Sequence, residues 1–151
     1  MCVRLLTAAA LVTAVAIPVT ALASSSSTAM MSPVVSAKLL GKNEVPKGSP
    51  TGSGLAVVHL NAAAGTVCWT FSKVAKIDKP TAAHIHKGKP GTAGPVVVPF
   101  GGSYKAKGCT KAAKKLITAI EEHPAAYYVN IHTAKYPGGA IRGSLVEGMH
   151  G

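Results

Sequence analysis

The sequence has few acidic residues. Only 5 of its 151 residues are Asp or Glu, against 16 Lys or Arg. The single aspartate, Asp78, lies between Lys76 and Lys79, so no acid is placed for a Ser/His/Asp triad. Glu121 and Glu122 are neighbours in a predicted helix, where their side chains diverge and cannot flank a glycosidic bond. The sequence therefore argues against a hydrolase with a Ser/His/Asp triad and against a glycosidase with two catalytic carboxylates.

Arginine is also scarce. Arg142 is the only arginine after Arg4, so the net charge of +11 comes almost entirely from lysines spread along the sequence. The glycine-rich stretch 88–94 is not followed by Lys-Ser/Thr and is therefore no phosphate-binding loop. Scattered lysine suits attraction to anionic polymers better than the reading of bases. We expect the partner to be an unknown protein or an anionic envelope polymer, with no specific nucleic acid.

A long apolar run occurs only at the amino terminus. Arg4 precedes an apolar stretch over 5–23, and Ala21-Leu22-Ala23 forms an A-x-A cleavage signal. A membrane anchor is the alternative, but the run contains Pro18 and has no basic stop-transfer flank. The pattern predicts a signal peptide over 1–23, a secreted or extracytoplasmic product, and no transmembrane segment after cleavage.

Cysteine is rare, with three in the whole chain. Removal of the leader takes Cys2 away and leaves Cys68 and Cys109, an even pair that predicts a disulfide in an exported protein. Two buried free thiols are the alternative. We expect a flexible linker over 24–33, one domain over 34–148 and a short tail over 149–151.

Alternation of apolar and polar residues predicts many short strands. It is clearest around Trp69 and Phe71, the expected core anchors. One helix is predicted over about residues 110–123, capped by Thr110 and ended by Pro124. The fold class is therefore mainly β, an Ig-like antiparallel β-sandwich with one short helix. The strands are expected at 34–40, 54–61, 66–73, 81–87, 96–98, 127–132 and 140–146.

Three histidines fall in two of these strands. His84 and His86 lie two residues apart and point to one face of their strand, with Ile85 on the other. His132 shares a face with Asn130 in a later strand. If the two strands are neighbours, His84, His86 and His132 can bind copper or zinc, since neutral imidazole suits both metals. The alternative is a polar network that braces loops.

Glu44 and Arg142 each lie in a short distinctive motif. We expect either an ion pair between them, which ties the loop 43–46 to the last strand, or bonds from Arg142 to backbone carbonyls.

Five ordered motifs resemble the CHRD domain, named from chordin, an extracellular antagonist of bone morphogenetic proteins, and found also in exported bacterial proteins. The resemblance runs from about Lys38 to Val146, with Lys47 and Ser144 as small departures from the family pattern. The two cysteines also resemble a pair that bacterial members carry. The motifs are Leu40-Gly41-Lys42-Asn43-Glu44-Val45-Pro46, Ala83-His84-Ile85-His86 with Gly88 and Gly91, Gly94-Pro95-Val96-Val97-Val98, Tyr128-Val129-Asn130-Ile131-His132-Thr133 and Pro137-Gly138-Gly139-Ala140-Ile141-Arg142-Gly143.

The resemblance implies an exported binding or structural module without an established catalytic mechanism. A weaker likeness gives the alternative: the His-x-His strand and a distant strand histidine are similar to the copper site of copper–zinc superoxide dismutases, which are also β-sandwiches. The chain has no clear equivalent of their bridging histidine or zinc-ligand loop. A metal-dependent oxidoreductase that uses the three histidines is therefore the second hypothesis, and fold-level analogy alone does not establish it.

Overall fold

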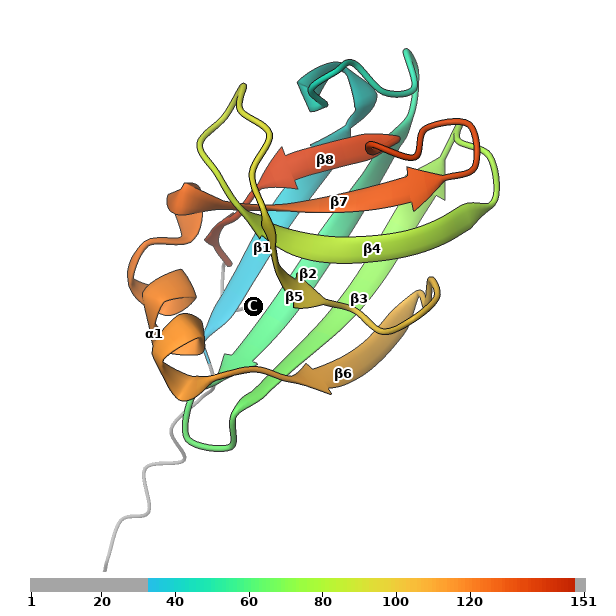
Figure 1. Ribbon diagram of the computed structural model, residues 1–151. Coiled ribbons are helices and arrows are strands. Elements are labelled where there is room, and N and C mark those ends of the chain that lie inside the picture. Colours follow the sequence, from blue (N-terminus) through green and yellow to red (C-terminus); the bar gives the residue numbers. More distant parts are fainter. Residues whose placement is uncertain (1–32, 149–151) are drawn as a thin grey trace, which may run out of the picture. The chain divides into compact units, whose positions relative to one another are not determined.

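The computed structural model describes residues 33–148 (Figure 1). The predicted signal peptide, nearly all of the predicted linker and the tail lie outside the described residues. Among the described residues, no helix is long and apolar enough to cross a membrane.

The domain is an antiparallel β-sandwich, as predicted (Figure 1). One continuous sheet has the order β5-β4-β7-β8-β1-β2-β3-β6, with β9 paired to β1. In Figure 1, β4, β7 and β8 lie across β1, β2 and β3, so the sheet folds over onto itself. The strands are β1 (Val34–Leu40), β2 (Ser53–Asn61), β3 (Thr66–Ala75), β4 (Pro80–Lys87), β5 (Val96–Pro99), β6 (Lys107–Lys111), β7 (Tyr127–Thr133), β8 (Ile141–Ser144) and β9 (Val146–Glu147), with α1 (Lys114–Glu122) and the 3-10 turns η1 (Gly41–Asn43) and η2 (Pro124–Ala126).

The segment between β5 and β6 bridges the two ends of the sheet. The backbone amides of Phe100 and Tyr104 donate to carbonyls of Ala83 and Thr81 in β4, at 3.1 and 2.9 Å. On the opposite side, the amide of Phe71 in β3 donates to a carbonyl of the same segment. Backbone polar groups at a sheet edge need partners, and this segment supplies several of them. The sandwich is therefore nearly a closed barrel.

The core forms where the apolar residues that alternate along each strand meet between the two halves of the folded sheet. Trp69 and Phe71 are buried as predicted, and the ring of Trp69 stacks on Phe100 with centroids 4.3 Å apart. From α1, Ile117 and Ile120 are fully buried in the same core. The lysines of α1 lie near its amino end and its glutamates near its carboxyl end, which is unfavourable for the helix dipole. Core packing therefore stabilises this helix.

The predicted helix begins too early. Residues 107–111 form β6, and Thr110 pairs with Val67 of β3 instead of capping the helix. The helix starts at Lys114, with Ala113 in the N-cap position and no side-chain cap. Pairing with β3 keeps residues 107–111 extended. Cys68 and Cys109 lie directly opposite each other in this pairing and form the predicted disulfide.

The predicted last strand, 140–146, is divided in two. β8 ends at Ser144, and β9 begins at Val146 on the other part of β1. Between them, Leu145 is fully buried, and its amide donates to the carbonyl of Tyr127. The burial of Leu145 explains the break, because this side chain enters the core at the turn between the two pairings.

Candidate metal centre and adjoining pocket

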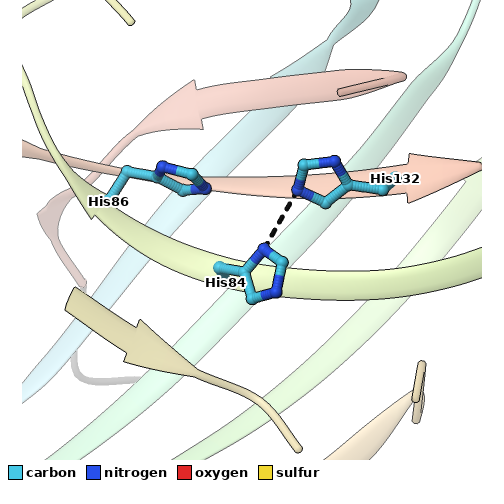
Figure 2. Close-up of side chains that lie close together, drawn as sticks. All are labelled: His84, His86 and His132. Carbon is cyan, nitrogen blue, oxygen red and sulfur yellow. Dashed lines mark hydrogen bonds between the residues drawn. The ribbon is translucent and has the colours of Figure 1, made fainter. Parts of the chain in front are cut away.

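The structure brings the three predicted histidines together (Figure 2). β4 and β7 are antiparallel neighbours, with His84 opposite Asn130 and Ala82 opposite His132. His84, His86 and His132 therefore share the face of the sheet that points away from the core. One nitrogen from each ring lies within 4.8 Å of the others.

The closest of these nitrogens have a separation near that of metal ligands. Nδ1 of His84 is 3.0 Å from Nε2 of His132 and forms a hydrogen bond with it (Figure 2), so a metal ion bound to both nitrogens would replace the shared proton. Two nitrogens bound at about 2.0–2.1 Å to a tetrahedral metal lie about 3.3 Å apart. The three ligand atoms lie within 4.8 Å of one another, so the rings must move closer together to bind one ion.

Backbone carbonyls fix the protons of two of the rings. Nδ1 of His86 lies 2.8 Å from the carbonyl of Gly94, and Nδ1 of His132 lies 2.9 Å from the carbonyl of Pro137. A carbonyl can only accept, so each Nδ1 carries a proton, and in the neutral form of each ring the lone pair is on Nε2. Carbonyl partners of this kind orient the histidine ligands of metal sites.

Within residues 33–148, Nε2 of His86 has no hydrogen-bond partner. The side chain is 7% exposed, and this nitrogen is buried without a hydrogen bond. Figure 2 shows a nitrogen of His86 directed toward His132. A buried lone pair without a donor is costly, and a metal ion would satisfy it.

Burial keeps the other two rings neutral near pH 7. Desolvation, followed by the nearby His132 and His86, lowers the pKa of His84 to about 4. Desolvation also lowers the pKa of His132, although its bond to Pro137 opposes this effect. Neutral imidazoles have a lone pair to offer a metal.

The chemistry of the cluster favours copper or zinc. All three ligands are nitrogens, and no carboxylate of the described residues belongs to the group. Calcium and magnesium prefer oxygen ligands. Three protein ligands also leave a position open for water or another small molecule.

A pocket of about 550 Å³ lies beside the cluster, on the other side of Tyr128. The Tyr128 ring stacks on His86 at 4.8 Å, and the Arg142 guanidinium lies 4.6 Å from the same ring. We call this cavity the Arg142 pocket. It is lined by Lys42, Asn43, Glu44, Val45, Pro46, Lys47, Lys89, Pro90, Gly91, Tyr128, Arg142, Gly143 and Ser144.

Arg142 joins the two walls of this pocket. Its Nε donates to the carbonyl of Asn43 and its Nη1 donates to the carbonyl of Thr92 at 2.8 Å. The side-chain amide of Asn43 donates in return to the carbonyl of Arg142. Glu44 is also adjacent, with Oε2 3.7 Å from Nε of Arg142. Arg142 therefore lies beside Glu44 as an ion pair and also bonds to backbone carbonyls, and its hydrogen bonds go to the carbonyls.

Reasoning from the sequence missed several supporting residues. Tyr128, Gly94 and Pro137 position the histidines, and Thr92 receives a bond from Arg142. Gly94 and Pro137 lie within motifs noted above, but their carbonyls carry no sequence signal. Only the pairing of β4 with β7 and the course of the loops reveal these contacts.

Fold and site together define a disulfide-bonded β-sandwich with histidines gathered on an outer face. The CHRD domain family model matches residues 35–145, so the chain belongs to the CHRD family. No curated protein and no solved structure matches this chain.

Proposed function

We propose that this CHRD domain acts outside the cytoplasm as a non-catalytic module that binds one copper or zinc ion through His84, His86 and His132. The observation that carries the proposal is the buried, unpartnered Nε2 of His86 beside two neutral imidazoles. Copper should bind more tightly than zinc, because divalent copper stands above zinc in the general affinity order.

The test is a calorimetric titration of metal-free protein with Cu²⁺ or Zn²⁺. We expect one ion per chain, and His86→Gln should weaken binding by about tenfold or more, a loss of at least about 1.4 kcal/mol. Paramagnetic resonance of the copper form should show nitrogen ligands. His59→Gln and His123→Gln are matched controls, because both histidines are exposed and lie outside the cluster. Equal affinity in His86→Gln and the controls would contradict the proposal.

Export is supported by the sequence and by the disulfide. The predicted signal peptide over 1–23 directs the chain outward, and structural disulfides persist mainly in oxidising compartments. Mass spectrometry of protein from the producing cells should find a chain that begins at Ser24 and lacks two hydrogens for the Cys68–Cys109 bond. A membrane-bound chain that retains residues 1–23 would argue against secretion.

A copper-dependent oxidoreductase is the second candidate. Its support is the open position that three ligands leave on the metal. Superoxide dismutation by copper-loaded protein, compared with His84→Gln loaded in the same way, tests this activity. A rate no higher than that of the variant would reject the enzyme and leave the binding module untouched.

A further inference from the structure

The Arg142 pocket is held open by a buried side chain. Arg142 is 3% exposed and bonds to both walls, one from the loop after β1 and one from the loop after β4. These loops are far apart in the sequence, and Figure 1 shows them near β8 at the same end of the sandwich. The cavity therefore has fixed walls, and its volume of about 550 Å³ falls in the range of about 300–1,000 Å³ typical of ligand sites.

The charge of this pocket is strongly positive. Lys42 and Lys47 come from one wall and Lys89 from the other, and all three are exposed. Glu44 is the only acidic residue that lines the pocket, and its buried carboxylate lies against Arg142. The three ammonium groups thus have no acidic partner in the lining, which favours a ligand with negative charge.

The walls are also apolar. Val45 is 39% exposed, and Pro46 and Pro90 are exposed beside the lysines. Such surfaces accept the apolar face of a ring, while the ammonium groups hold an anionic substituent. Tyr128, the aromatic residue of the lining, is only 5% exposed and its ring contacts His86, so it cannot stack on a nucleic acid base.

We propose that the Arg142 pocket binds an acidic sugar unit of an extracellular polymer, with the carboxylate or phosphate of the sugar held by Lys42, Lys47 and Lys89. This site is separate from the metal centre, and it holds whether or not the histidines bind a metal. The expected use of the domain is to anchor itself to an anionic polymer outside the cell.

The probes are trigalacturonate, a phosphorylated maltotriose and neutral maltotriose, each titrated into the metal-free protein. We expect binding of one or both acidic sugars, which identifies the anionic group, and no binding of maltotriose. Affinity should fall as salt rises, because the Debye length shortens to about 8 Å at physiological ionic strength.

Two sets of variants separate a site from general attraction. The pocket variant carries Gln at positions 42, 47 and 89, and the control carries Gln in place of Lys107, Lys114 and Lys115, which are exposed and absent from the lining. The pocket variant should lose about tenfold in affinity, which corresponds to about 1.4 kcal/mol, because it removes all three ammonium groups of the lining. The control should lose less than about twofold.

A third variant tests the cavity without a change of charge. Ser144 lines the pocket, so the larger side chain of Ser144→Phe should occupy part of the cavity and also abolish binding. Circular dichroism checks that each variant is folded. Equal losses in the two lysine variants, full binding by Ser144→Phe, or no binding of either acidic sugar would overturn the proposal.

Discussion

Replacement of Glu44 by Gln should make the domain more stable at alkaline pH. Burial raises the pKa of Glu44 from 4.5 to about 7, although Arg142 and a backbone bond from Val45 act in the opposite direction. The folded protein therefore holds the Glu44 proton more tightly than the unfolded chain does. The stabilising effect of this proton is complete below about pH 4.5 and is lost as the pH rises through 7.

The size of the effect follows from the shift. A rise from 4.5 to about 7 corresponds to about 3 kcal/mol, at about 1.36 kcal/mol for each pKa unit. Gln is neutral at every pH and has nearly the same shape as protonated Glu. The variant and the parent should thus be similar at pH 4.5, and Glu44→Gln should be more stable by about 3 kcal/mol at pH 8.

Urea unfolding of both proteins at pH 4.5 and pH 8, with the disulfide intact, measures this difference. Comparison at each pH cancels the titration of all other groups, His84 among them. Glu122→Gln removes an exposed carboxylate and should change the free energy of unfolding by less than about 0.5 kcal/mol. A parent more stable than Glu44→Gln at pH 8 would refute the reasoning, because the ion pair with Arg142 would then outweigh desolvation.

Three further substitutions test the fold. Replacement of Cys68 and Cys109 by Ser should cost on the order of 3–4 kcal/mol in urea unfolding, since the bonded residues are 41 positions apart in the chain; an unchanged midpoint would contradict this. Gly139→Ala should cost more than about 1 kcal/mol, because φ is +138° and the new Cβ would collide with Glu44, and an unchanged melting temperature would argue against this. Ile120→Ala should cost about 2–5 kcal/mol by calorimetry, and a loss below about 1 kcal/mol would mean that α1 contributes little to the core.

The strands could be predicted from the sequence wherever one face is buried and the other exposed. The alternation of apolar and polar residues around Trp69 predicted β3, because Trp69 is buried while its neighbours Cys68 and Thr70 lie on the outer face. β6, Lys-Gly-Cys-Thr-Lys, has no large apolar residue, and its residues alternate only between exposed and half-buried. Its strand conformation depends on pairing with β3, a long-range contact that no local pattern contains.

The candidate metal centre could be predicted only in part. The alternation of side chains along a strand predicted that His84 and His86 share one face of their strand. It also predicted that His132 and Asn130 share one face of a later strand. Whether the faces coincide depends on β4 and β7 being neighbours, and these strands are separated by β5, β6 and α1 in the chain. The pocket could not be foreseen, because its walls are loops far apart in the sequence that hydrogen bonds from Arg142 join.

Tyr128 is the structural link between the two candidate sites. Its ring contacts His86 on the side of the metal centre and Arg142 on the side of the pocket. Its hydroxyl accepts a bond from the amide of Gly94, and the carbonyl of Gly94 receives Nδ1–H of His86. One residue therefore helps to orient both a metal ligand and the pocket wall. Loss of the ring should weaken both sites, whereas loss of the hydroxyl in Tyr128→Phe should act mainly through Gly94 and His86.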